Sequence, residues 1–282
     1  MKSNDELERA SLGVGIPPRP TVLSQLESEM KKDEPDLRQI EKLISADVGI
    51  SAAMIKTVNS PFYGLASKVV SVRQAVNLLG LLAVTRIVTG MALRNVAPGL
   101  NALELEKFLE DSAQVALVSS YMAGLMSGVD KDQAFTFGLF QNAGVLLLMS
   151  GLPGYRKTWE LANSSQVKGL VQIEQEQHRV THTYIGYLMA KDWGLPEPIA
   201  EAIHHHHDYE ALSGSGKDLP AQSRDLIALA LLAERVLHAE SGFERTADWV
   251  VGGAIALDHF SLTESGFQDL AATVLTLRQA GV

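Results

Sequence analysis

Helix signals recur along the whole chain, and they constrain its fold more than any other feature of the sequence. Asp36 can cap a helix in which Ile40 and Ile44 lie on one face, and Ser71 opens a capping box with Gln74. About a dozen helices of this kind are expected, and no stretch shows the alternation that is typical of a strand. The sequence therefore predicts an all-α protein.

The expected helices group into successive parts of the chain. Those before residue 99 are short, and those after it are longer and more apolar, so we place a boundary near Gly99–Asn101. One very apolar helix is expected over residues 132–149, at the centre of the second group. The predicted parts are an N-terminal tail (1–15), an N-terminal helical subdomain (16–99), a helical core (100–240) and a C-terminal helical extension (241–282).

Composition excludes several classes of function. The net charge is −9 and no Lys/Arg block occurs, which argues against a nucleic-acid partner and an anionic membrane surface. The chain has no cysteine, so thiolate zinc sites, disulfides and thiol catalysis are excluded. Residues 1–9 are polar and lack the apolar core of a secretory signal, and the apolar stretches are shorter than the roughly 20 residues of a membrane span. We expect a cytoplasmic protein.

Four consecutive histidines, His204–His207, lie at the end of the helix expected after Pro196. Imidazole is the commonest metal ligand and proton carrier among side chains. Because residues three or four apart share a helix face, we expect His204 and His207 to point one way and His205 and His206 elsewhere. At most two or three of the four can reach one site. The alternative is a solvated last turn whose imidazoles suit the helix dipole, and it stays open above all for His204 and His205.

Polar residues within apolar segments are further candidates for a site. His182 precedes an amphipathic helix, which it could simply cap. Glu234 and Asp111 lie on helices where an unpaired buried carboxylate would be costly, so a salt bridge is the alternative to a pocket role. Gln141 and Asn142 interrupt an apolar run and need hydrogen-bond partners, either in the core or in a polar cavity.

Motifs of the common nucleotide-binding and serine-hydrolase sites are missing. The sequence has no GxxxxGK[ST] loop, no strand-associated GxGxxG and no GxSxG elbow. Phosphate-loop, dinucleotide-binding and Ser-His-Asp chemistry are therefore not expected.

Several segments carry motifs that occur together in one known family. Ile44–Gly64 contains an acidic helix start and an Asn-Ser-x-Phe-Tyr-Gly turn, and Val70–Gly80 contains an Ala-x-x-x-Leu-Gly helix. With these motifs the chain resembles the HDOD family, a bacterial branch of the HD-domain phosphohydrolase superfamily related to HD-GYP proteins. Ile16–Pro20, Gly186–Pro196 and Ala202–His207 resemble the opening prolines and later segments of the family. The resemblance runs from about residue 16 to about residue 240. It implies an HD-like helical core and a role in signal transduction.

The resemblance also implies where a metal site would lie. Catalytic relatives hold metal with a histidine on one helix, a His-Asp pair on the next and a late aspartate. These positions fall, in that order, at Asp111, at Gln141-Asn142 and at Glu234, while His182 and His206 or His207 match extra histidines of relatives with more than one metal. Amide carbonyls are weak ligands for transition metals, so the metal-bound water of a phosphohydrolase is not expected.

We therefore predict a non-catalytic signalling or regulatory domain that acts through a protein partner or a small ligand, without a required cofactor. The ligand pocket, or its vestige, would comprise Asp111, Gln141, Asn142, His182, His206, His207 and Glu234. One alternative is a metal-dependent phosphohydrolase using Mn, Mg, Fe or Ni, with ligands among His182, His206, His207, Glu234 and Asp111. The other is a pure interaction scaffold in which these residues pack dry against one another. No receiver, cyclase or DNA-binding module is expected.

Overall fold

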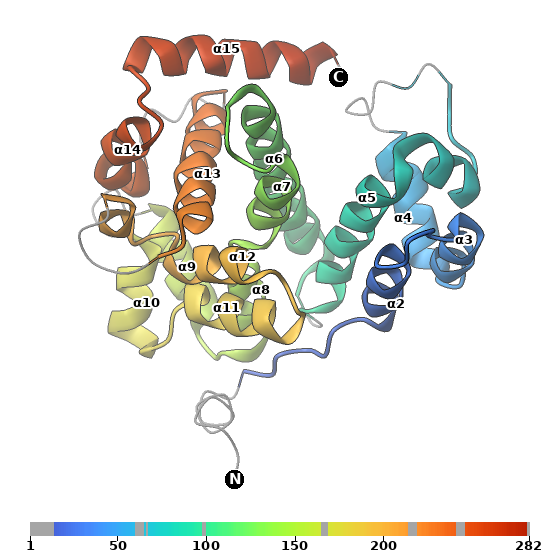
Figure 1. Ribbon diagram of the computed structural model, residues 1–282. Helices are drawn as coiled ribbons and strands as arrows, with labels where there is room; N and C mark the ends of the chain where they lie inside the picture. The colour runs from blue at the N-terminus through green and yellow to red at the C-terminus, as the bar shows by residue number, and fades with distance from the viewer. Residues whose placement is uncertain are drawn as a thin grey trace. The chain divides into compact units, whose positions relative to one another are not determined.

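The computed structural model is all helical (Figure 1). It describes residues 14–59, 65, 67–97, 100–164, 169–213, 219–240 and 246–280, and every regular element in these ranges is a helix. The all-α prediction is confirmed. Contacts divide the chain into a small unit, Pro18–Asn95 with Ala272–Val282, and a large unit, Met1–Pro17 with Val96–Ala271.

The small unit contains the first described helices of the chain. They are α2 (Thr21–Met30), α3 (Leu37–Ser45), α4 (Val48–Val58), α5 (Val72–Ala92) and the 3-10 turn η2 (Leu93–Asn95). The caps expected from sequence are present: Asp36 accepts from the first turn of α3, and Ser71 accepts from the N–H of Gln74. At Gly80 the backbone leaves the helical region with φ 76°, which only glycine adopts readily, so α5 breaks at this residue.

The family-like turn after α4 is described only in part, because residues 60–64 lie outside the described residues. The side chain of Asn59 caps the end of α4, since its Nδ2 donates to the Ile55 carbonyl. It also donates to the Val69 carbonyl, and its Oδ1 accepts from the Val69 N–H at 2.8 Å. One side-chain amide thus joins the end of α4 to the segment that leads into α5.

The large unit carries the longer helices. They are α6 (Ala102–Leu125), α7 (Lys131–Phe140), α8 (Ala143–Gly151), α9 (Tyr155–Ser164), α10 (Leu170–His178), α11 (His182–Asp192), α12 (Glu197–His205), η3 (Tyr209–Ser213), α13 (Ala221–Glu240), α14 (Ala247–His259) and the start of α15 (Glu264–Ala280). Figure 1 shows α13 beside α6 and α7, against which it packs.

The single helix expected over residues 132–149 is wrong, because the structure has two helices there. α7 ends at Phe140 and α8 begins at Ala143, with a turn at Gln141 and Asn142 between them. Asn142 lies outside the helical region, with φ −101° and ψ 10°. Asparagine favours such positions because its amide competes with the helical backbone. The apolar pattern continues through this break, which is why periodicity alone did not reveal it.

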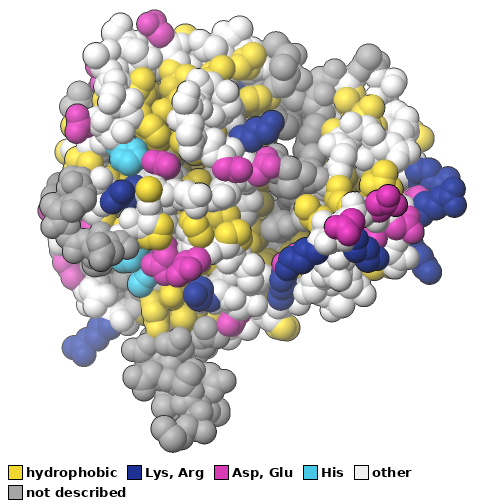
Figure 2. Space-filling view, in the orientation of Figure 1, with side chains coloured by type: hydrophobic (Ala, Val, Ile, Leu, Met, Phe, Trp, Pro, Cys, Tyr) yellow, Lys and Arg dark blue, Asp and Glu magenta, His cyan; other side chains and the backbone are white. Residues whose placement is uncertain are grey.

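Lys131–Gly151 is also the one described segment that is long and apolar enough to cross a membrane. However, 67% of the 18-residue window that meets this test is buried inside the fold. A buried pair of core helices accounts for its composition, so it is weak evidence for a membrane span. On the face shown in Figure 2, acidic and basic side chains are interspersed, in keeping with the lack of a Lys/Arg block.

Glycine lets the central helices of the large unit approach closely. A Cβ added at Gly144 of α8 would lie 2.0 Å from the carbonyl oxygen of His182, and one added at Gly138 of α7 would lie 2.7 Å from the Cα of Ala116. Both contacts are with backbone, which cannot give way as a flexible side chain can. The backbone of His182, at the start of α11, is therefore pressed directly against α8.

Candidate functional site

Three histidines meet inside the large unit. His182 is the first residue of α11, which is capped by the hydroxyl of Thr181, and His206 and His207 follow directly after α12. The Nε2 atoms of His182 and His206 are 3.3 Å apart, and one ring nitrogen from each histidine lies within 4.8 Å of the other two. His182 is fully buried and His206 is 6% exposed. We call this group the three-histidine centre.

The predicted grouping of His204 with His207 is wrong. α12 ends at His205, so the helical spacing that would bring residues three apart onto one face does not extend to His207. His206 and His207 turn together toward His182, whereas His204 and His205 gather around Glu201. The histidine run is thus divided into two pairs: His206 and His207 belong to the three-histidine centre, and His204 and His205 lie beside Glu201.

Each histidine of the centre is held through its Nδ1 atom by an oxygen acceptor. The acceptors are the carboxylate of Glu174 for His182 (2.9 Å), the carbonyl of Ile203 for His206 (2.8 Å) and the carboxylate of Asp248 for His207 (2.8 Å). An acceptor at Nδ1 assigns the ring proton to that nitrogen, which leaves the Nε2 lone pair to face the centre. The Nε2 of His207 is buried and has no hydrogen-bond partner among the described residues.

The carboxylate behind His182 is itself tightly bound. Glu174 is fully buried, accepts from the Tyr155 hydroxyl and accepts from the backbone N–H of His182 at 3.0 Å. Burial alone would raise the pKa of Glu174, but His182 and Tyr155 together lower it. Burial and the neighbouring Glu174 raise the pKa of Tyr155, so its hydroxyl stays protonated and continues to donate.

Asp248 is the carboxylate behind His207, as Glu174 is behind His182. Burial would raise the pKa of Asp248, but His207 and hydrogen bonds from His207 and Tyr209 lower it. At His207 burial would lower the pKa, and the Asp248 carboxylate raises it.

His206 has no carboxylate partner, and burial together with His207 and His182 places its pKa well below the usual range. The lowered pKa favours the neutral imidazole, which is the form that ligates a metal.

The donor set fits a transition-metal ion. Nitrogen ligands bound at about 2.1 Å to a tetrahedral ion lie roughly 3.4 Å apart, and the His182–His206 separation is 3.3 Å. Imidazoles whose other ring nitrogen donates to a carboxylate or carbonyl are the usual arrangement behind metal-binding histidines. Three imidazoles suit Zn, Cu, Fe or Ni and do not suit Mg. His182, His206 and His207 could hold one such ion.

Gln141 and Glu234 adjoin the centre. Gln141 is buried in the turn between α7 and α8, and its Nε2 donates to Oε1 of Glu234 on α13 at 2.7 Å. Burial, reinforced by Asp248, raises the pKa of Glu234 to about 7, although His207 and Gln141 act in the opposite direction. One oxygen of Glu234 is therefore committed to the amide of Gln141.

The remaining predicted residues have other surroundings. Asn142 is partly buried at the start of α8, and its side chain makes no capping hydrogen bond. Asp111 is largely exposed on α6, where partial burial raises its pKa and its electrostatic neighbours are Lys107, Glu110 and His238. The three histidines are not among these neighbours.

Four supporting residues were not predicted from the sequence: Tyr155, Glu174, Tyr209 and Asp248. Glu174 lies 8 residues before His182, and Asp248 lies 41 residues after His207. Neither spacing is characteristic of a local structure, and Asp248 lies beyond residue 240, where the family resemblance ends. No sequence signal could have joined these residues to the histidines.

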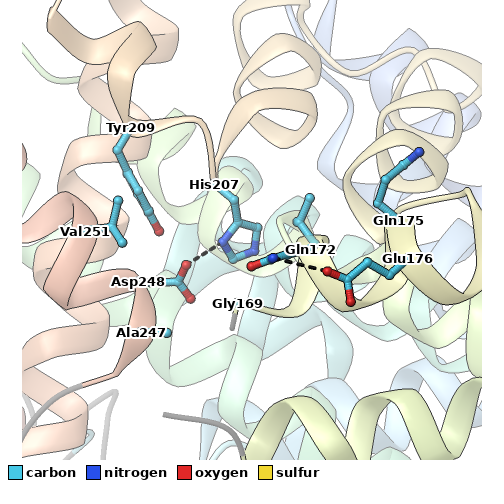
Figure 3. A pocket seen from close by; sticks show the side chains of 10 residues that line it. Gly169, Gln172, Gln175, Glu176, His207, Tyr209, Ala247, Asp248 and Val251 are labelled. Atoms are coloured by element: carbon cyan, nitrogen blue, oxygen red, sulfur yellow. Dashed lines mark hydrogen bonds and ion pairs between the residues drawn. The ribbon is translucent and has the colours of Figure 1, made fainter. Parts of the chain in front are cut away.

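A pocket of about 500 Å³ opens beside His207. Figure 3 shows the His207 ring with Asp248 on one side and Gln172 of α10 on the other. Its polar lining includes the hydrogen-bonded pair of Gln172 and Glu176, with Nε2 and Oε1 3.2 Å apart. One member of the three-histidine centre is therefore adjacent to a space that a small ligand could enter.

Comparisons with known proteins agree with this fold. The chain is 25% identical over 240 residues to an uncharacterized protein of Treponema pallidum (strain Nichols), a match that covers 82% of this chain and 44% of that protein. The chain thus spans less than half the length of this relative.

Solved structures resemble the whole described fold. An HDOD domain protein of Geobacter sulfurreducens matches with a TM-score of 0.70 and 20% identity, covering 98% of this chain and 95% of that one. A candidate phosphohydrolase of Shewanella amazonensis SB2B matches with a TM-score of 0.72 and 19% identity, covering 99% and 96%. A candidate signal transduction protein of Marinobacter aquaeolei VT8 matches with a TM-score of 0.70 and 20% identity, covering 100% and 60%.

The family model adds the decisive match. The model described as the HDOD domain matches residues 16–209, which include α2 to α12 and both elements that carry the three-histidine centre. The resemblance predicted from the sequence is confirmed, and the chain belongs to the HDOD domain family.

Proposed function

We propose that this protein is a signal-transduction or regulatory domain whose three-histidine centre holds one transition-metal ion and does not hydrolyse phosphoesters. The observation that carries the proposal is the contrast across the site. On one side, each of three imidazoles has a ring nitrogen within 4.8 Å of the other two, and the Nε2 atoms of His182 and His206 are 3.3 Å apart; on the other, the amide of Gln141 is hydrogen-bonded to Glu234. The site has good ligands for one metal and poor ligands for a second.

The buried Nε2 of His207 supports a metal over a purely structural cluster. An unpaired buried polar atom costs about 1–3 kcal/mol, and a dry scaffold would gain by filling that position with a carbon. A bound ion would satisfy this nitrogen together with its two neighbours. It would supply a Lewis-acid centre and a rigid link between α11 and the end of α12.

The Gln141–Glu234 pair supports the absence of hydrolysis. Its amide is a weak ligand for a transition metal and already donates to the carboxylate that could have served instead. The fold relatives include both a candidate phosphohydrolase and a candidate signal transduction protein, at identities that show the fold alone. The choice between a hydrolase and a signalling domain therefore depends on the residues of this site. We further propose a cytoplasmic location and a signalling partner or small ligand as the means of output.

The proposal is tested by metal analysis of protein purified without immobilised-metal chromatography, followed by a hydrolysis panel. We expect tightly held Zn, Fe, Ni or Cu that is lost in His206→Ala, and no hydrolysis of bis-p-nitrophenyl phosphate or nucleotides with added Mn, Mg, Ni or Fe. Turnover that disappears in both Glu234→Ala and His206→Ala would overturn the non-catalytic assignment.

A single-metal hydrolase is the second candidate, and two observations favour it. Three protein ligands with an open fourth position are the ligand set of catalytic zinc sites, and one of the three histidines, His207, lines a pocket. The same panel decides between the two, because only this candidate gives turnover that follows the metal content.

A further inference from the structure

The other half of the histidine run forms a second cluster, on the last turns of α12. Glu201, His204 and His205 occupy positions i, i+3 and i+4, so they share one face of the helix. One donor atom of each lies within 4.8 Å of the other two. We call this group the outer cluster. It shares no residue with the three-histidine centre.

One distance within the outer cluster is that of two ligands around an ion. The Nε2 of His205 lies 3.9 Å from Oε2 of Glu201, too far for a direct hydrogen bond. Two ligand bonds of about 2.1 Å separate their donor atoms by roughly 3.4 Å at a tetrahedral angle and by at most about 4.2 Å. The observed separation falls between these limits. The other ring nitrogen of His205 lies 3.8 Å from Oδ2 of Asp208, so a second carboxylate lies near the ring without a direct hydrogen bond to it.

The side chains of the outer cluster are held in place and reachable from solvent. The ring of His204 stacks on Tyr187 of α11, with centroids 4.7 Å apart and an interplanar angle of 22°. Side-chain exposure is 14% for His205 and 25% for Glu201. Contact with neighbouring helices restricts the rotamers before any ion binds, which lowers the entropic cost of binding.

The end of α12 adds a favourable field. His204 and His205 lie in the last turn, where the helix dipole favours positive charge. The same field that would favour a protonated imidazole also favours a divalent cation held by neutral imidazoles and a carboxylate. The last turn could therefore hold protonated imidazoles or a bound metal ion. The metal ion is favoured because three donor atoms lie within 4.8 Å of one another.

We infer that α12 carries a second metal site, accessible from the surface, in which Glu201, His204 and His205 bind a divalent ion that prefers imidazole, such as Zn²⁺ or Ni²⁺. The histidine run then contributes ligands to two neighbouring sites. His204 and His205 belong to an outer, exchangeable site, and His206 and His207 belong to the inner, buried centre. This inference does not depend on the function proposed for the buried centre.

The test is a zinc titration of the full, untagged chain after removal of metal, with a competing chromophoric chelator to count equivalents. We expect His204→Gln/His205→Gln to bind one equivalent fewer than the native chain, which binds two when the three-histidine centre also holds an ion. Glu201→Gln should weaken the outer equivalent by more than about tenfold, since loss of even a supporting residue costs 10- to 100-fold in metal affinity. His206→Gln should remove only the inner equivalent, so the two sites fail independently.

His259→Gln is the matched control, because this histidine pairs with Asp225 on other helices and should leave both equivalents unchanged. Circular dichroism verifies that each variant is folded, and Glu201→Gln decides the question if the double variant is not. The inference is overturned if the double variant binds as many equivalents as the native chain, or if His206→Gln removes every equivalent.

Discussion

At the scale of the residue, the direction of each imidazole matters more than its presence. In all three histidines of the buried centre, the Nδ1–H donates to an oxygen acceptor. Two of those acceptors are carboxylates, Glu174 and Asp248. These carboxylates keep the proton away from Nε2 and increase its basicity as a ligand. They are as much a part of the proposed site as the histidines.

Asp248→Asn isolates this effect. The amide oxygen can still accept from Nδ1 of His207, so the ring is still oriented, but the negative charge behind it is lost. We expect metal affinity to fall roughly 10- to 100-fold with little change in the circular dichroism spectrum. Chelator competition measures the affinity.

Asp225→Asn is the control for this variant, because it removes the carboxylate from the His259 pair, whose Nε2–Oδ1 distance is 2.7 Å. Equal affinity losses in both variants, or none in Asp248→Asn, would contradict a supporting role for Asp248.

At the scale of the element, close helix contact positions the ligands. α8 touches the start of α11 at Gly144, where a Cβ would lie 2.0 Å from the carbonyl oxygen of His182. The obstacle is backbone, so α11 would have to move as a unit. The site thus depends on a glycine that contributes no ligand.

Gly144→Ala should therefore destabilise the fold by about 1–3 kcal/mol, the usual cost of overpacking, and weaken metal binding through displacement of His182. Urea unfolding measures the first effect and zinc titration the second. Gly124→Ala on α6 is the matched control, since a Cβ there meets nothing within 4 Å and alanine should be neutral or stabilising by up to about 1 kcal/mol. Unchanged stability of Gly144→Ala would contradict the packing argument.

At the scale of the whole molecule, the chain consists of two compact units, and the proposed metal lies in only one of them. All three tryptophans, Trp159, Trp193 and Trp249, belong to the large unit. Tryptophan fluorescence therefore follows the unfolding of the unit that carries the three-histidine centre, whereas far-ultraviolet circular dichroism follows the helices of both units.

Metal at 100 times its Kd should raise the melting temperature reported by tryptophan by roughly 5–10 °C, because binding at that concentration contributes about 2.7 kcal/mol. Thermal melts with and without zinc, followed by fluorescence and circular dichroism, measure the shift. The His206→Ala variant should show a much smaller one. A tryptophan transition that zinc leaves unmoved would argue against metal binding in the large unit.

The sequence by itself determined the helical class, most helix starts and the family. Those signals are local: a cap such as Asp36, a glycine such as Gly80, or a run of residues spaced along one helix face. Gln141 and Glu234 were also recognised as polar residues in an apolar setting. However, the sequence pattern missed the break after Phe140, because the hydrophobic residues continue across it.

The resemblance had matched His182 with His206 or His207, but only the tertiary structure showed that both join His182 and which acceptors lie behind the three rings. The end of α12 at His205 separates the run into two pairs, and the fold brings Glu174 and Asp248 to the buried pair and His182. These contacts join residues that no helical or strand period relates. A hydrogen bond to Nδ1 depends on where neighbouring helices pack, and that packing is a property of the whole core rather than of any local segment.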